Sequence, residues 1–160
     1  AYESRLSLVG SEMCIRDRIY TSEQAFFDDL EQMNSIIKAQ TGNDASIIRF
    51  PGGSSNTVSK DYCPGIMTQL VNDVTARGLL YCDWNVSSGD ANNKPISTEQ
   101  VVQNVISGVQ SHNVSVVLQH DIKDFSVNAV EQIIQWGQAN GYTFLPLTTS
   151  SPMSHHRVNN

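Results

Sequence analysis

A strand-like run that ends in an imidazole and a carboxylate is the first sign of chemistry in this sequence. The segment SVVLQHDIKDFS, residues 115–126, passes from apolar residues directly into Gln119, His120 and Asp121. In a parallel α/β sheet, the loops that follow the carboxyl ends of the strands form the usual site for chemistry. His120 is therefore the first candidate for a catalytic residue.

Two earlier strand-like runs carry polar residues of the same kind. Arg49 lies near the end of SIIRF (46–50). Asp83 lies near the end of LLYCDW (79–84), and Asp90 follows in the next loop. A lone histidine at a strand end is more often a structural residue. Three successive strands that present Arg, Asp and His at one edge of a sheet form a constellation, and the grouping predicts a functional site.

Helix patterns alternate with these strands. Capping-box spacing marks two helix starts, at Thr21 with Gln24 and at Ser97 with Gln100. The order of elements is αβαβαβαβ, which predicts an α/β fold with parallel strands joined by right-handed crossovers. The expected helices are 21–42, 64–77, 97–112 and 126–140, and the expected strands are 46–50, 79–84, 114–118 and 142–147.

Composition narrows the classes of protein that the chain could represent. The 160 residues are 39% hydrophobic and 16% charged, which is typical of a globular domain with a real core. No run approaches the length of a membrane-spanning helix. The net charge of −6, with no basic stripe, argues against nucleic acid as a partner.

The first 18 residues differ in character from the rest. They read AYESRLSLVGSEMCIRDR and show no coherent helical or strand period. The run SLVGSEMCIRDR resembles a translated sequencing adapter. We therefore expect residues 1–18 to be non-native and residues 19–160 to hold the domain.

Three motifs resemble those of a known family. RFPGGSSN (49–56), CDWNVSSGDA (82–91) and VVLQHD (116–121) resemble the last three of five motifs in polysaccharide deacetylases with the NodB homology domain, carbohydrate esterase family 4. They occur in the family's order at the ends of three consecutive strands. The final PMSHHRVNN is similar to the tail of peptidoglycan or chitooligosaccharide deacetylases of Gram-positive bacteria. The resemblance covers about residues 19–160.

The resemblance implies a fold, a reaction and a location. The fold would be a distorted (β/α) barrel, of which this chain is the C-terminal part with the N-terminal strands missing. The enzyme would be a hydrolase acting on C–N bonds other than peptide bonds: a metal-dependent N-deacetylase of GlcNAc-type sugars in peptidoglycan or chitin-like polysaccharide. A divalent metal, usually zinc, would activate water. The protein would act extracellularly or in the cell envelope.

Roles for individual residues follow from the same resemblance. His120 resembles the acid that protonates the leaving amine, and Arg49 and Asp90 resemble the pair that orients and tunes that histidine. The amide of Gly52 resembles the oxyanion donor.

The remaining residues carried over from the family face the substrate. Leu118 resembles the apolar wall of the acetyl pocket, Trp84 would lie near the sugar, and Pro51 belongs to the substrate-binding motif. The family often has Tyr at the position of Gly52 and an aromatic residue at the position of Ala91. Both departures reduce the surface available for stacking on a sugar.

The family's first two motifs, which carry the base and the metal ligands, have no match in this chain. FFDDL (26–30) has a similar composition, but Asp28 and Asp29 are expected on the solvated face of a helix. The four histidines include no His-x-x-x-His spacing. We therefore expect the metal ligands to be absent from this chain, and the chain to be inactive by itself.

Some interpretations stay open. Cys63 and Cys82 could form a disulfide in an exported protein or remain two buried thiols. His155 and His156 point in opposite directions if the chain there is extended, which argues against joint metal binding. The alternative function is a non-catalytic glycan-binding or structural α/β module.

Overall fold

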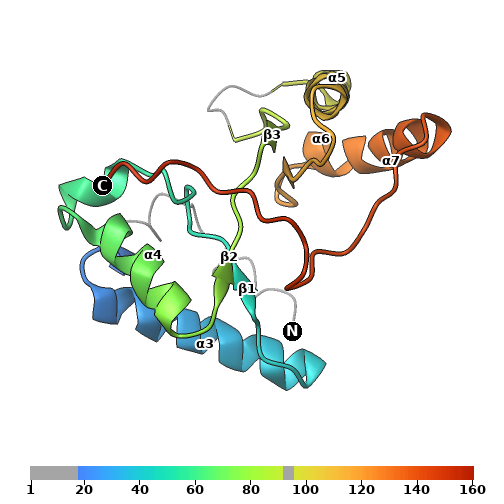
Figure 1. Ribbon diagram of the computed structural model, residues 1–160. Coiled ribbons are helices and arrows are strands. Elements are labelled where there is room, and N and C mark those ends of the chain that lie inside the picture. The colour runs from blue at the N-terminus through green and yellow to red at the C-terminus, as the bar shows by residue number, and fades with distance from the viewer. Residues whose placement is uncertain (1–17, 92–95) are drawn as a thin grey trace. The chain divides into compact units, whose positions relative to one another are not determined.

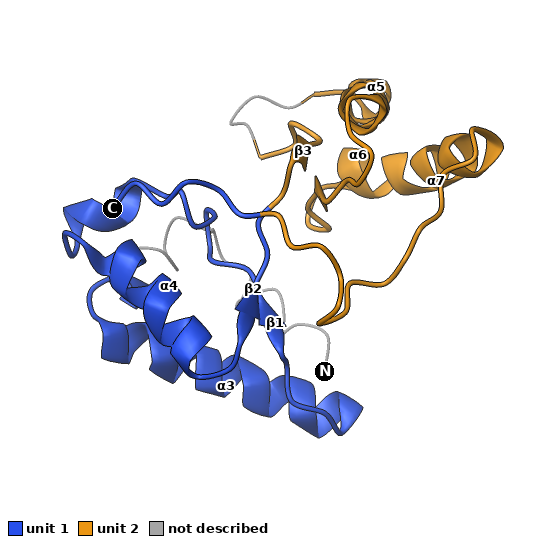
Figure 2. Cartoon of the chain, viewed as in Figure 1, with its two compact units in different colours: residues 1–83, 155–160 blue, residues 84–154 orange. Residues whose placement is uncertain are grey.

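The computed structural model describes residues 18–91 and 96–160, and the chain divides into two compact units. Unit 1 comprises Ala1–Asp83 and His155–Asn160, and unit 2 comprises Trp84–Ser154 (Figure 2). Each unit has its own cluster of buried apolar side chains. The sequence predicts a non-native segment over residues 1–18, and all of it except Arg18 lies outside the described residues.

Unit 1 places two helices beside a short parallel strand pair (Figure 1). Its elements are α3 (Glu23–Thr41), β1 (Ile47–Ile48), the 3-10 helix η1 (Val58–Asp61), α4 (Ile66–Ala76) and β2 (Leu80–Tyr81). Ile47 lies opposite Leu80, and the two strands run parallel. The parallel pairing confirms the α/β prediction for this part of the chain.

The start of α3 differs by one residue from the expected capping pair. Ser22 is the N-cap, and its hydroxyl accepts a hydrogen bond from the main-chain N–H of Ala25 at 3.1 Å. The hydroxyl of Thr21 instead donates to the carbonyl of Arg18 at 2.7 Å. Serine and threonine are both favoured N-cap residues, so residue type separates adjacent candidates only weakly.

Aromatic packing forms the centre of unit 1. Phe26 contacts both Phe27 and Phe50, with ring centroids 5.3 and 5.5 Å apart. The other side of α3 is polar, and Asp28 and Asp29 are exposed there, as the helical period predicts. These two aspartates therefore do not form the family's missing first motif.

Unit 2 repeats the same design with different elements. They are β3 (Val86–Ser87), α5 (Thr98–Gln110), β4 (Val117–Leu118), α6 (Asp124–Val127) and α7 (Ala129–Ala139). β3 runs parallel to β4, with Ser87 opposite Leu118. Ser97 caps α5 through a bond from the N–H of Gln100 at 3.2 Å, which confirms the predicted capping pair.

Close packing fixes α5 against β3. A Cβ added at Gly108 would lie 2.4 Å from a methyl carbon of Val86. A contact this short requires glycine, so the helix can approach the strand only at a residue without a side chain.

Three expectations about unit 2 are wrong. β3 forms in a stretch expected to be a loop, and the helix expected over 126–140 is split into α6 and α7. The run 142–147 is not a strand, and Leu145 is 79% exposed. An extended run becomes a strand only when a neighbour supplies hydrogen-bond partners, and none of the described residues does so here.

The strands among residues 18–91 and 96–160 form two separate pairs. A closed barrel is therefore not seen in the part of the chain that the structure describes. No helix in that part is both long enough and apolar enough to cross a membrane.

A buried carboxylate joins three segments of unit 1. Asp83, 1% exposed, accepts hydrogen bonds from the N–H of Ser54 at 2.8 Å and the hydroxyl of Ser54 at 2.5 Å. It also accepts a bond from the N–H of His156 at 2.9 Å. The turn after β1, the end of β2 and the segment 155–160 are thus held by one side chain.

The same C-terminal segment caps α4. The main-chain carbonyl of Asn160 accepts from the N–H of Thr68 at 2.7 Å, and its side-chain oxygen accepts from the N–H of Gly65 at 2.7 Å. The first N–H groups of a helix lack partners within the helix. Asn160, distant in the sequence, supplies the acceptors for two of these N–H groups.

Replacing Asp83 with Ala should lower the free energy of unfolding by about 3 kcal/mol, because three hydrogen-bond donors would lose their acceptor. Urea unfolding followed by circular dichroism measures this loss. The matched control is Asp44→Ala, since the bonds of Asp44 to Lys38 and to the side-chain amide of Asn34 are exposed, and the substitution should have little effect. Equal effects of the two substitutions would contradict the role given to Asp83.

Candidate functional site

Asp90 and His120 meet at one edge of the β3–β4 pair. Asp90 follows Ser87, the last residue of β3, and His120 follows Leu118, the last residue of β4. Because these strands are parallel neighbours, the loops after them emerge side by side. Two residues predicted separately from the sequence are thus brought together.

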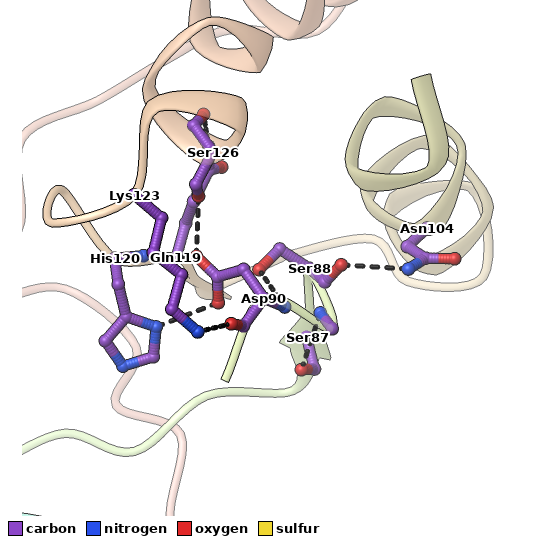
Figure 3. Close-up of polar contacts among 9 residues, drawn as sticks. Ser87, Ser88, Asp90, Asn104, Gln119, His120, Lys123 and Ser126 are labelled. Carbon is purple, nitrogen blue, oxygen red and sulfur yellow. Dashed lines mark hydrogen bonds and ion pairs between the residues drawn. The ribbon is translucent and has the colours of Figure 1, made fainter. Parts of the chain in front are cut away.

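The carboxylate of Asp90 holds both the ring and the main chain of His120 (Figure 3). Its Oδ1 lies 2.8 Å from Nδ1 of the imidazole, and its Oδ2 accepts the main-chain N–H of His120 at 2.7 Å. A carboxylate oxygen accepts, so Nδ1 carries the hydrogen. Nε2 lies on the opposite side of the ring from this bond.

Burial differs between the two partners. The side chain of Asp90 is 1% exposed, and that of His120 is 14% exposed. A buried carboxylate behind a partly accessible imidazole is the arrangement in which the carboxylate orients the ring and the ring performs the proton transfer.

A tight turn presents Asp90 to the ring. Gly89 has φ of 79°, and a Cβ there would lie 2.8 Å from the side-chain nitrogen of Asn104. That nitrogen donates to the carbonyl of Ser88 at 2.9 Å, and the hydroxyl of Ser88 accepts the N–H of Asp90 at 3.3 Å. α5 therefore supports the loop from behind.

The environment of Asp90 favours its ionised form. Burial, the largest single influence, acts to raise the pKa of Asp90. The hydrogen bonds from Ser126 and His120 act against it, and the net result is a pKa below the ordinary value. The ionised form of Asp90 is thus stabilised by the groups that donate hydrogen bonds to it.

Ser126 and Lys123 are members of this site that sequence reasoning missed. The hydroxyl of Ser126 donates to Oδ2 of Asp90 at 2.5 Å, and the ammonium group of Lys123 donates to the main-chain carbonyl of Asp90. Ser126 was expected only as the first residue of a helix. Its partner lies 36 residues away, and no local pattern indicates such a bond.

The other predicted site residues are divided between the units. Leu118 is buried at the end of β4, and Trp84 is the first residue of unit 2. Arg49, Pro51 and Gly52 belong to unit 1. Their roles stay predictions.

Local geometry explains the PGGSSN motif in unit 1. Gly52 and Gly53 have φ of 79° and 80°, a region that favours glycine. The carbonyl of Pro51 accepts a bond from the hydroxyl of Tyr20 at 2.8 Å. Arg49 is exposed. The turn is a defined structure rather than a flexible linker.

The two adjacent histidines near the C-terminus contact different groups. Nε2 of His155 lies 3.0 Å from the carbonyl of Tyr81, and its ring stacks on that tyrosine at 4.2 Å. Nδ1 of His156 lies 3.1 Å from the hydroxyl of Ser55. Both imidazoles have structural contacts within unit 1.

Metal binding finds no support among residues 18–91 and 96–160. Within those ranges no three His, Cys, Asp or Glu side chains converge so as to hold an ion. The described residues therefore do not fit the divalent metal that the resemblance implies. Cys63 and Cys82 are both free thiols in this structure.

Comparison with known proteins gives three informative likenesses. The chain is 28% identical over 123 residues to a peptidoglycan-N-acetylglucosamine deacetylase of Bacillus cereus, covering 74% of the chain and 42% of that protein. It matches the crystal structure of the catalytic domain of peptidoglycan N-acetylglucosamine deacetylase from Eubacterium rectale with a TM-score of 0.90 and 96% identity, covering 91% of the chain and 66% of that structure. A polysaccharide deacetylase of Bacillus cereus matches with a TM-score of 0.66 and 27% identity, covering 81% of the chain and 61% of that structure.

No protein-family model matches the chain. The chain spans less than half the length of the curated relative and about two thirds of the Eubacterium rectale structure. The likenesses all fall on one class of α/β proteins, the carbohydrate deacetylases. The chain belongs to the polysaccharide deacetylase family, carbohydrate esterase family 4.

The lowered pKa of Asp90 predicts how its contribution to stability depends on pH. A carboxyl group with a depressed native pKa stabilises the fold above the unfolded value of about 3.9, and this contribution is lost as pH falls through the lower native pKa. Asp90→Asn should therefore be less stable than wild type near neutral pH, and the gap should narrow in acid. Urea unfolding between about pH 3 and pH 6 measures it.

The control for this series is Asn113→Ala, an exposed substitution that changes no titratable group. Its difference from wild type should stay constant with pH. A gap for Asp90→Asn that is equally constant would mean that the ionised carboxylate contributes nothing specific to the fold.

Proposed function

We propose that this chain is the part of a polysaccharide N-deacetylase that delivers a proton to the leaving amine. The observation that carries the proposal is the Asp90–His120 pair, in which a buried carboxylate holds Nδ1 of a partly accessible imidazole. The named relatives are peptidoglycan N-acetylglucosamine deacetylases, and this supports GlcNAc-type sugars of peptidoglycan or chitin-like polysaccharide as the substrate class.

The chemistry of the reaction explains the need for such a pair. Hydrolysis of an N-acetyl group breaks a C–N bond, and the departing nitrogen must gain a proton to leave as an amine. His120 supplies that proton from Nε2. Asp90 keeps the ring in one orientation before and after the transfer, because its two oxygens bind the Nδ1–H and the main-chain N–H of the same residue.

Other residues complete the proposed site. Leu118, buried two residues before His120, would form the apolar wall for the acetyl methyl group. Trp84 would contact the sugar. Three residues of unit 1 keep the roles that the family resemblance implies: Gly52 as the oxyanion donor, Pro51 as a substrate contact, and Arg49 as the partner of Asp90 in orienting and tuning His120.

The metal and the barrel belong to the complete domain in this proposal. The divalent metal, zinc by family resemblance, would take its ligands from residues other than those described, since none of the described side chains cluster suitably. The chain by itself would then be inactive. The β1–β2 and β3–β4 pairs would form part of a distorted (β/α) barrel, and the protein would act extracellularly or in the cell envelope.

Zinc binding tests the proposal that the metal ligands lie outside this chain. Isothermal titration calorimetry of the 160-residue chain should show no one-to-one site of submicromolar Kd, because a catalytic zinc site needs about three protein ligands. The complete protein is the positive control and should bind zinc tightly. Tight stoichiometric binding by the chain itself would contradict the proposal.

Substitution of His120 in the complete protein tests the acid role. His120→Ala should lower kcat for acetate release from peptidoglycan fragments by about 10²–10⁴-fold, the usual worth of a positioned acid. Asp90→Asn should also reduce kcat and move the alkaline limb of the pH profile to lower pH, because the negative charge beside the ring is lost.

Metal content separates this role from a ligand role. Both variants should retain the zinc of the wild-type protein. If His120→Ala lost its metal while Asp90→Asn left the pH profile unchanged, His120 would be a ligand rather than a proton donor. If the wild-type protein bound glycans without releasing acetate, the non-catalytic module would be the better description.

A further inference from the structure

The carboxylate of Asp90 receives a hydrogen bond from a residue outside the catalytic pair. Two of its bonds come from His120, the residue that it has to orient. The bond from the hydroxyl of Ser126 to Oδ2, at 2.5 Å, comes from a different element, α6. Ser126 can therefore hold the carboxylate of Asp90 in place independently of His120.

Ser126 is itself held firmly. It is 0% exposed, so water does not compete for its hydroxyl. Its carbonyl accepts a bond from the side chain of Gln119 at 2.6 Å, and its N–H donates to the carbonyl of Lys123 at 2.9 Å. Gln119 immediately precedes His120. The Gln119–Ser126 bond thus joins the two ends of the loop between β4 and α6, and both ends of this loop contact Asp90 through His120 and Ser126 (Figure 3).

We propose that Ser126 is a positioning residue for the deacetylation reaction, which fixes the Asp90 carboxylate so that Oδ1 faces Nδ1 of His120. The inference rests on the function proposed above. Ser126 does not touch the reacting atoms; it acts through Asp90 on the orientation of the imidazole.

The geometry of a carboxylate explains why such a residue is needed. The group is planar and can rotate about the bond that joins it to the side chain. Donors on both oxygens stop this rotation, and Ser126 and the His120 N–H together hold Oδ2. With Oδ2 held, Oδ1 stays 2.8 Å from Nδ1. The same bond from Ser126 helps to keep Asp90 ionised, as its lowered pKa indicates.

The charged neighbours of the pair are few in this part of the chain. Lys123 donates to the main-chain carbonyl of Asp90 rather than to its carboxylate, so it holds the loop and not the rotation of the side chain. Asp121 follows His120 but is exposed. Ser126 supplies a side-chain donor to Oδ2 of Asp90 from outside the pair.

Nuclear magnetic resonance of the full chain tests the positioning directly, without need of activity. The imidazole nitrogens and the Nδ1–H proton of His120 are assigned by their loss in His120→Gln. In Ser126→Ala this proton should exchange faster with water and its signal should broaden, because the carboxylate loses one of the two donors that hold Oδ2. His112, whose Nδ1 bonds to the carbonyl of Gly108 at 2.9 Å, is the internal reference.

Three variants provide the comparison. Ser126→Thr keeps the hydroxyl and should preserve the His120 signal. Ser126→Cys has a weaker donor of similar size and should give an intermediate result, which serves if Ser126→Ala fails to fold. Ser111→Ala removes an exposed hydroxyl that bonds only to the Ser107 carbonyl among its described partners, and should change nothing.

Kinetics of the complete protein test the consequence for the reaction. Ser126→Ala should lower kcat by up to about a hundredfold, the cost of a displaced catalytic group, with KM unchanged. Ser126→Thr should restore it. An unchanged His120 signal in Ser126→Ala would overturn the proposal, and so would a changed signal with an unchanged kcat. A wild-type protein without deacetylase activity would instead overturn the proposed function, while the resonance data would still decide whether Ser126 positions the pair.

Discussion

A carboxylate removed from water costs free energy unless hydrogen-bond donors replace the solvent, and each unit is organised around one carboxylate that meets this condition. Asp83 in unit 1 and Asp90 in unit 2 are 1% and 2% exposed. Each accepts bonds from a main-chain N–H and from a serine hydroxyl. These anions fix the conformations of loops that apolar packing alone would leave undetermined.

In unit 2 one set of bonds offsets the burial of Asp90 and also holds the proposed catalytic pair. The donors that offset the burial of Asp90 include the ring and the main chain of His120, so the histidine cannot turn away without leaving a buried charge unsatisfied. All the members of this network lie in unit 2. The pair is therefore complete within one compact part of the chain.

The helices α3, α4 and α5 and the strands β1, β2 and β4 could be predicted because their signals are local. Ser97 and Gln100 mark a helix start within four residues of sequence, and the predicted start is confirmed. The run 142–147 has the composition of a strand but lacks a partner among the described residues, which composition cannot reveal. Asp90 and His120 could be singled out through the family motifs that they belong to. Ser126 was not, because its bond to Asp90 joins residues 36 positions apart.

The tie between Asp83 and the C-terminal segment has a consequence for synthesis on the ribosome. Asp83 emerges 73 residues before His156, whose N–H is one of its donors. At about 5 to 20 residues per second, the nascent chain waits about 4 to 15 seconds for that partner. Asn160, which caps α4, arrives later still. Unit 1 is thus begun first and finished last, after the whole of unit 2 has been translated.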